Sequence, residues 1–274
     1  MLSTLIIMIT IGLLVIAYLV LQPAYLGRKR KKISNTEFPQ KWKNTLNNKW
    51  PLYRRLPDLL KQNLHNRIKI FMVEKQFIGA NGFEVFEEHR LLIAAQACLL
   101  IVNKPFEYFD KLQIIMIYPS TFVASRERMQ SDGTIINESS VNSGEAWETG
   151  KIILSWDATY AGLINISDGQ NVVIHEFAHL LDNTNGSANG APLLEHANNY
   201  QQWSRIFSAA YDRLQHSVER GHKTTFNPYG TVNPGEFFAV ASELFFEKSS
   251  LFQKEEPLLY QQLEKFYAVD PALW

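Results

Sequence analysis

The residues with the clearest potential for chemistry lie in the segment 171–182, which reads NVVIHEFAHLLD. His175 and His179 are four positions apart, so on a helix they project from one face and their imidazoles can converge on a single metal ion. Glu176 lies beside His175, where its carboxylate can reach a water on that ion without being a ligand. This HExxH arrangement is typical of zinc peptidases, in which zinc lowers the pKa of the water and the glutamate takes its proton. The segment predicts a catalytic zinc site.

A catalytic zinc also needs a third protein ligand. The metzincin arrangement would place a histidine six residues after His179, but Asn185 stands there. Glu236 and Glu243 are seven positions apart in PGEFFAVASELFFE and therefore share one face of a predicted helix. Carboxylates on an otherwise apolar helix must be paired, coordinated or near water. The candidates that remain open are Glu195, Glu236 and Glu243, with His196 a weaker one.

The elements that must position these residues can be predicted from the hydrophobic pattern. Two short β-rich runs predict strands at 112–118 and 151–156, and the second is a candidate edge strand for pairing with an extended substrate. A turn at Asp168 and Gly169 is expected to start the metal-binding helix. A small mixed sheet followed by a helical half predicts an α+β domain. Helices are expected at 83–102, 171–182, 192–219, 234–248 and 255–268.

The N-terminus predicts a membrane anchor. Residues 2–21 contain no charge and are rich in Leu, Ile and Val, over a length that matches a bilayer-spanning helix. A block of five basic residues follows at 28–32, so the positive-inside rule places the body in the cytoplasm, tethered to the inner membrane by a single pass. The expected division is an anchor at 1–22, a basic juxtamembrane linker at 23–48 and a zinc peptidase domain at 49–274.

The charge balance disfavours nucleic acid as a direct partner. The chain of 274 residues has 27 basic and 27 acidic residues, and five of the basic ones belong to the block at 28–32. The remainder is therefore acidic overall, unlike a nucleic-acid-binding body. Cys98 is the single cysteine, which excludes an intrachain disulfide. Its neighbours in the sequence are apolar, so we expect its side chain to pack in the core as a small hydrophobic group.

Four segments together resemble a known family: GFEVFEEHRLLIAAQACLL, IILSW, DGQNVVIHEFAHLLD and NPYGTVNPGEFFAVASELFFE. The resemblance is to the zinc-dependent peptidases of the Mlc titration factor A family, also called the DgsA anti-repressor family, which in turn is similar to the catalytic domain of anthrax lethal factor. It extends over roughly 49–271, and two separated motifs agree in order and spacing.

The resemblance implies a fold and a set of roles. The fold would be a gluzincin-like zincin domain, with one Zn²⁺ per chain bound by His175, His179 and Glu236. It implies Glu176 as the general base and Tyr229 as a hydroxyl aimed at the substrate carbonyl oxygen. Glu243 would then support one of the metal ligands without binding the metal itself. From its position three residues after His179, Asp182 is a further candidate to hold a ligand imidazole.

The leading hypothesis is a membrane-anchored zinc metallopeptidase that hydrolyses peptide bonds in peptide or protein substrates. The alternative is a zinc-containing binding protein that sequesters a transcriptional regulator, a partner that the family resemblance allows. A membrane-tethered scaffold without metal is a third hypothesis, which the intact HEFAH segment disfavours.

Overall fold

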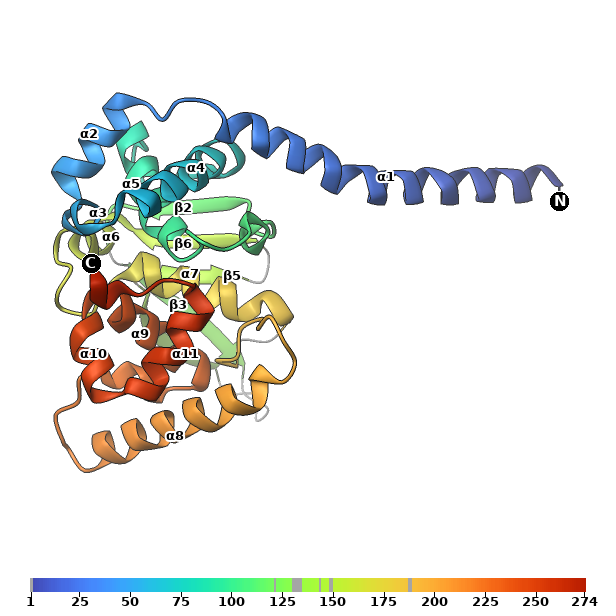
Figure 1. Cartoon of the computed structure of the whole chain (residues 1–274). Helices are drawn as coiled ribbons and strands as arrows, with labels where there is room; N and C mark the ends of the chain where they lie inside the picture. Colours follow the sequence, from blue (N-terminus) through green and yellow to red (C-terminus); the bar gives the residue numbers. More distant parts are fainter. Residues whose placement is uncertain (1, 121, 130–134, 143, 148–149, 187–188) are drawn as a thin grey trace.

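The computed structural model of the chain describes residues 2–120, 122–129, 135–142, 144–147, 150–186 and 189–274 (Figure 1). A small sheet lies between helices on both sides, with the N-terminal helices above it and the C-terminal helices below it in the view of Figure 1. The helices are α1 (Leu2–Ser34), α2 (Gln40–Lys49), α3 (Pro51–Arg55), α4 (Asp58–Glu74), α5 (Glu87–Leu99), α6 (Trp156–Ile164), α7 (Val172–Asp182), α8 (Asn199–Glu219), α9 (Pro234–Glu247), α10 (Ser249–Glu255) and α11 (Pro257–Tyr267).

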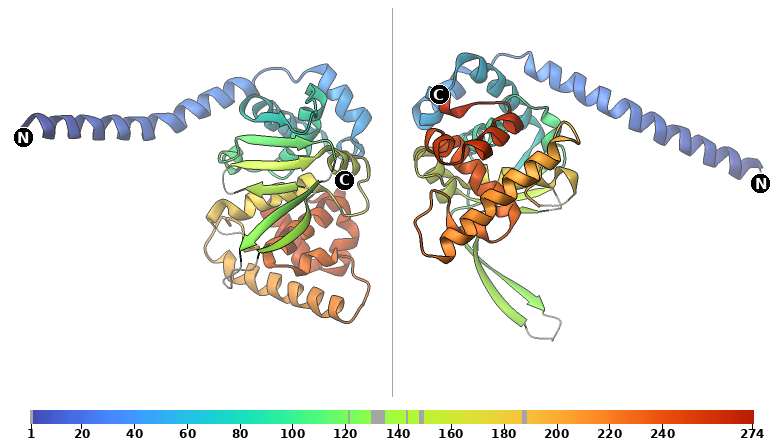
Figure 2. Two further views of the ribbon diagram at one scale, coloured as in Figure 1. Left: turned by 180° about the vertical axis from the view of Figure 1, so that it is seen from behind. Right: turned by 60° about the horizontal axis from the view of Figure 1, so that its bottom comes forward.

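The sheet has the strand order β1-β2-β6-β5. Strands β1, β2 and β6 run parallel, and β5 pairs antiparallel with β6 at the edge. A separate antiparallel pair, β3 and β4, forms a hairpin that extends away from the body (Figure 2, right). The bounds are β1 (Gln76–Gly79), β2 (Ile114–Tyr118), β3 (Phe122–Met129), β4 (Ile135–Asn142), β5 (Gly144–Trp147) and β6 (Lys151–Ser155).

The two strands expected from the sequence are confirmed as β2 and β6. Their register pairs Ile115 with Ile152 and Ile117 with Leu154, and these four side chains are buried, so alternate residues supply the core face. The expectation that the second of them is an edge strand is wrong, because β6 pairs on both sides and β5 occupies the edge.

Three helices carry most of the core that holds the site. The body of α5 from Leu91 to Leu99 is wholly buried, and α7 and α9 pack directly against each other. The expected helices at 171–182 and 234–248 are confirmed as α7 and α9. The described part of the chain also contains four short 3-10 helices: η1 (Phe106–Phe109), η2 (Asn183–Asn185), η3 (Pro228–Thr231) and η4 (Pro271–Leu273).

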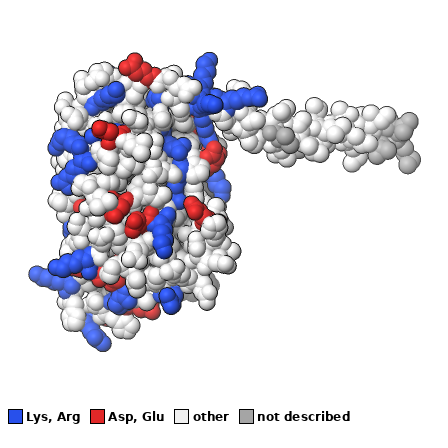
Figure 3. All heavy atoms as spheres, viewed as in Figure 1, with Lys and Arg blue, Asp and Glu red and all other residues white. Residues whose placement is uncertain are grey.

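The predicted transmembrane helix and the single-pass placement in the inner membrane are wrong. Among the residues described, none of the helices combines the length and the apolar content that crossing a membrane requires. The apolar run does not form a helix of its own: α1 continues through the basic block to Ser34, and its C-terminal part packs on α4. Residue 1 of the expected anchor lies outside the described residues. On the face drawn in Figure 3, basic side chains gather where α1 joins the body.

The prediction of the fold class is also wrong. The described chain is mostly helical around a small sheet with three parallel strands, rather than a gluzincin-like α+β domain behind a membrane helix. Within the segment expected to be a linker, Phe38 and Leu46 are buried in the core, so this part of the chain packs with the body. The division at residues 22 and 48 stays a prediction.

Candidate metal centre

Helix α7 carries the two histidines, and its start is fixed by Asn171. The Asn171 Oδ1 accepts hydrogen bonds from the backbone N–H groups of Val173 and Ile174, both at 3.1 Å, which makes it the N-cap of the helix. The cap therefore lies closer to the helix than the expected turn at Asp168 and Gly169. Buried apolar side chains fix the rotation of α7 and leave the histidine face toward α9.

Helix α9 supplies the carboxylate from its first turn. Asn233 caps this helix by accepting a hydrogen bond from the Glu236 N–H at 2.9 Å, and Pro234 occupies the first helical position. Glu236 thus lies near the positive end of the helix dipole, which favours an ionised carboxylate. Phe237 and Phe238 are fully buried and hold the first turn of α9 in place.

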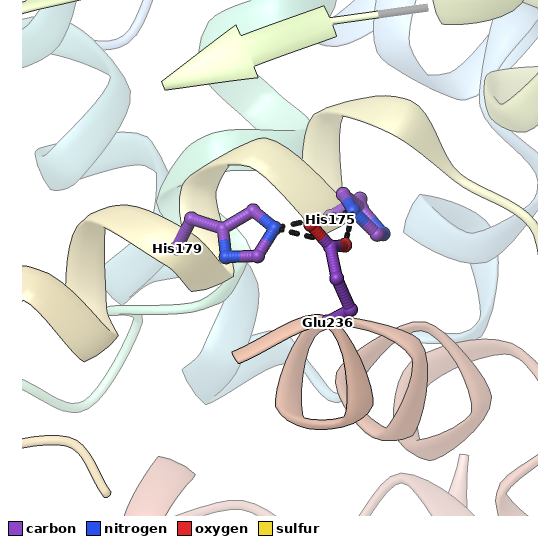
Figure 4. Close-up of side chains that lie close together, drawn as sticks. All are labelled: His175, His179 and Glu236. Carbon is purple, nitrogen blue, oxygen red and sulfur yellow. Dashed lines mark hydrogen bonds and ion pairs between the residues drawn. The ribbon is translucent and has the colours of Figure 1, made fainter. Parts of the chain in front are cut away.

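The two helices bring His175, His179 and Glu236 together (Figure 4). The Glu236 Oε2 lies 3.0 Å from His175 Nε2 and 3.3 Å from His179 Nε2. The two imidazole Nε2 atoms lie 3.2 Å apart. One ligand atom from each residue falls within 4.8 Å of the other two, so all three can face one ion.

The chemistry of this cluster fits a divalent metal. Two imidazole nitrogens and one carboxylate oxygen are a donor set of catalytic zinc, which leaves a fourth position open. Burial lowers the pKa of His175, but hydrogen bonds to Glu236 and Glu243 outweigh burial and hold that pKa well above its usual value. Burial also opposes ionisation of Glu236, yet the two histidines lower its pKa to about 2. The cluster therefore favours positive charge at its centre.

Behind the cluster, a buried polar network holds His175. The His175 Nδ1 donates to Glu243 Oε1 at 2.8 Å, and the other oxygen of Glu243 accepts from the Asn171 backbone N–H at 2.5 Å. The Asn171 Nδ2 donates to Gln96 at 2.9 Å and to Glu247 at 3.1 Å. One asparagine therefore connects the start of α7 with two carboxylates of α9 and with α5.

Glu176 and Tyr229 lie beside the cluster, at a cavity of about 440 Å³ whose wall includes both side chains. Glu176 is buried on α7. Tyr229 lies on η3 with its ring centroid 6.0 Å from that of His175. Burial raises the pKa of Tyr229, and the nearby carboxylates of Glu236 and Glu176 raise it further, so the phenol keeps its proton at neutral pH.

The remaining candidates lie elsewhere. The Asp182 carboxylate is buried at the end of α7, where it accepts a hydrogen bond from the Gly190 N–H at 2.8 Å, and burial raises its pKa to about 6. Its predicted support of a ligand imidazole stays a prediction. Glu195 and His196 are exposed on the loop before α8, outside the cluster of ligand atoms.

Sequence reasoning missed Asn171, Gln96, Glu247 and Gly162. A Cβ at position 162 would lie 3.0 Å from the Asn171 Cα, so the glycine permits the close approach of α6 to this network. Asn directly before an apolar helix is an N-cap signal and could have identified Asn171. Gln96 and Glu247 gave no such signal, because their partners come from other helices.

The chain has relatives over most of its length. Residues 25–268 match the family model described as glucose-regulated metallo-peptidase M90. An uncharacterized protein of Synechocystis sp. is 39% identical over 97% of this chain and 98% of its own length. Mlc titration factor A of Cronobacter sakazakii is 33% identical over 81% of this chain and 84% of its own length, and that of Klebsiella pneumoniae is 30% identical over 86% and 88%.

These matches confirm the resemblance to Mlc titration factor A that the sequence motifs indicated. The family description suggests a metallopeptidase, and the described residues contain a cluster that can hold a metal ion. Because the family model covers nearly the whole chain, this protein belongs to the glucose-regulated metallo-peptidase M90 family.

Proposed function

We propose that this protein is a zinc-dependent peptidase whose metal is held by His175, His179 and Glu236. The observation that carries the proposal is the convergence of these three donors from α7 and α9, with an acidic side chain and a phenol beside them. When bound, zinc would supply a Lewis acid that polarises a peptide carbonyl and lowers the pKa of a water. Family membership supports the same reaction class.

Glu176 is the proposed general base. Its carboxylate lies next to the histidine cluster and borders the cavity, so it can accept a proton from a water held there. The same side chain can pass the proton on to the leaving amine. Its burial keeps the carboxylate in a setting of low dielectric, where its charge acts strongly on neighbouring atoms.

Tyr229 is the proposed donor to the substrate carbonyl oxygen. The phenol stays protonated at neutral pH, so its O–H can donate a hydrogen bond as negative charge develops on that oxygen. Glu243 keeps His175 oriented through the Nδ1 hydrogen bond, which leaves Nε2 directed at the cluster.

The substrate is proposed to be a peptide in extended conformation. Strand β5 contacts α7 and forms the edge of the sheet, where a further strand can add through backbone hydrogen bonds. The cavity of about 440 Å³ next to His175 has room for one or two substrate side chains.

The test compares the full chain with Glu176→Gln, using Glu219→Gln as the matched control because Glu219 is an exposed glutamate at the end of α8. Elemental analysis should give about one zinc per chain in all three proteins. Cleavage of a panel of short peptides should be lost in Glu176→Gln, since an amide cannot accept the water's proton. The His175→Ala/His179→Ala variant should lose the zinc.

Full cleavage by Glu176→Gln would overturn the assigned base, and stoichiometric zinc in the double histidine variant would overturn the metal site. The metal-free scaffold hypothesis predicts no zinc in any of the proteins.

A second candidate function is supported by the names of the relatives, which describe factors that titrate Mlc. In this reading, the protein acts by binding and sequestering a transcriptional regulator, and cleavage is not needed. The two functions separate in cells, because Glu176→Gln would abolish a peptidase phenotype and leave a sequestration phenotype intact.

A further inference from the structure

A second cavity, of about 270 Å³, lies between the loop before α8, the start of α8 and the end of α11. Among the described residues, its walls share no side chain with the cavity beside the metal cluster. The floor consists of Trp203, Gln262 and Phe266, which are all buried. Lys104, from the turn after α5, also contributes to the wall.

Lys104 is an unusual lysine because only 5% of its surface is exposed and its ammonium has no oxygen partner among the described residues. Within the described part of the chain, its Nζ lies 4.5 Å from the ring centroid of Phe266 and 5.4 Å from that of Tyr108, with no hydrogen bond or ion pair. Burial lowers the pKa of Lys104, and Glu195 on the rim partly offsets this. Aromatic rings stabilise a cation but supply no acceptor for its three N–H groups.

Two other buried lysines show what such a group ordinarily requires. The Lys69 Nζ donates to the carbonyl oxygens of Ser34 and Thr36, the first at 2.6 Å. The Lys75 Nζ donates to the carbonyl oxygens of Phe109 and Leu112 at 2.6 and 2.7 Å. Both ammonium groups are satisfied within the protein, whereas that of Lys104 faces a cavity.

We propose that this cavity binds a small organic anion through Lys104. The anion would carry a single carboxylate or phosphate group as acceptor for the Lys104 ammonium, because the other two charged side chains of the wall, Lys265 and Glu195, offset each other. Its remaining polar groups would meet the side-chain amides of Gln262, Gln202 and Asn199, and its carbon atoms would lie against Trp203. The proposal is independent of the peptidase chemistry.

The experiment uses the full chain with three probes: glycerate, glycerol 3-phosphate and uncharged glycerol. The first carries a carboxylate and the second a phosphate monoester on a similar small polyol, so together they show which anionic group the cavity accepts. The readout is the indole N–H signal of Trp203 in ¹H–¹⁵N spectra, assigned with Trp203→Phe. This N–H donates to the Gly190 carbonyl at 2.8 Å, which keeps it fixed at the cavity wall.

The expected result is a saturable shift of the Trp203 signal with one or both anions and none with glycerol. Lys104→Met should weaken the binding at least tenfold, whereas Lys254→Met, which removes an exposed lysine outside the cavity, should leave it unchanged. The proposal would be overturned if neither anion shifts the Trp203 signal or if glycerol shifts it equally. It would also be overturned if Lys104→Met binds the anion as tightly as the wild-type protein does.

A second variant tests the same site without touching the buried lysine. Gln202 is exposed at the rim, and Gln202→Trp places an indole across the opening. This variant should also weaken binding at least tenfold. Binding of wild-type strength in Gln202→Trp would overturn the proposal even if Lys104→Met fails to fold.

Discussion

At the residue scale, Tyr229 differs from the groups around it because 52% of its surface is exposed, while both histidines and Glu236 are mostly buried. Asn227 holds its backbone by accepting a hydrogen bond from the Tyr229 N–H at 3.0 Å. The phenol itself extends over His175 toward the cavity. A side chain with a fixed backbone and a half-exposed phenol is suited to contact a substrate and contributes little to the stability of the fold.

Tyr229→Phe should therefore lower kcat by about 10²-fold, because a donor to the developing oxyanion is lost. Zinc content and the free energy of unfolding should stay at the wild-type level. Peptide turnover, elemental analysis and urea unfolding measure the three quantities. Tyr25→Phe, at an exposed position on α1, is the control and should change none of them. Unaltered kcat in Tyr229→Phe would remove the tyrosine from the chemistry.

The residues of the cluster could be predicted from sequence to different degrees. His175 and His179 share one helix, so their spacing alone predicts a common face. Glu236 comes from another helix, and spacing left it open against Glu195 and Glu243. The family resemblance favoured Glu236, and the packing of α7 on α9 is what brings its oxygen within 3.0 Å of His175 Nε2.

At the scale of elements, the start of α7 is where the fold and the site meet. Asn171 caps this helix, donates its backbone N–H to Glu243 and donates its side-chain N–H groups to α5 and α9. The orientation of His175 depends on Glu243, so it depends indirectly on this asparagine.

Asn171→Ala should destabilise the protein by about 2 kcal/mol, the upper end for loss of an N-cap, because buried partners also lose their donor. Zinc affinity should fall by roughly 10-fold, as expected when outer support of a ligand is disturbed. Urea unfolding and zinc titration measure both effects.

Asn171→Ser is the informative control for this change. Serine keeps a cap acceptor but has no amide N–H, so it should recover most of the stability and less of the zinc affinity. Equal zinc affinity in Asn171→Ala and wild type would show that Glu243 needs no help from the cap.

Glu247 makes the packing of α9 sensitive to pH. Burial raises its pKa to about 8, and the nearby carboxylates of Glu243 and Asp168 contribute, against the hydrogen bond from Asn171. The folded protein thus keeps this proton up to about pH 8, while the unfolded chain releases it near its ordinary value of 4.5. Between these values the folded state binds more protons, so the free energy of unfolding falls as pH rises.

In the metal-free protein, unfolding free energy should therefore decline between about pH 5 and pH 8, by an amount on the order of a few kcal/mol. Glu247→Gln carries no charge at any pH and should reduce that slope. The exposed Glu219→Gln should keep it. Urea unfolding at pH 5, 6.5 and 8 provides the comparison, and identical slopes in all three proteins would exclude Glu247 as the source.

The elements themselves were predictable where the pattern was local. Alternating burial in β2 and β6 and the apolar faces of α7 and α9 are visible in sequence. The placement of β5 at the sheet edge was not visible, because pairing order depends on contacts between distant segments. The prediction of α1 failed for a related reason: an apolar run shows that a helix forms, but its end and its packing depend on the neighbouring body.

At the scale of the whole molecule, α1 leaves the body as a long helix whose first part projects outward (Figures 1 and 2). Its C-terminal part is held by Arg30, which is buried and donates to Glu74 at 2.9 and 3.1 Å from two nitrogens. The same guanidinium also contacts Glu107 and Asp110 of the η1 region and lies 4.8 Å from the ring centroid of Phe106. One basic residue of the block at 28–32, Arg30, therefore joins α1 to the body.

Arg30→Met should loosen the packing of this end of α1 on α4. The substitution keeps an apolar stem but leaves the Glu74 carboxylate, which is 11% exposed, without its cation, and loss of one partner from a pair with so little exposure costs about 3 kcal/mol. Amide exchange of residues 25–34 should accelerate, and the free energy of unfolding measured in urea should fall by that amount.

Lys29→Met removes a neighbouring exposed charge and should change neither measurement. The Lys69 ammonium still donates to the Ser34 carbonyl, so α4 should keep its protection and the last residue of α1 should stay in contact with it. If Arg30→Met exchanges no faster than Lys29→Met, α1 is held by its apolar contacts, such as Ile33 against the core, and the ion pairs at Arg30 add little.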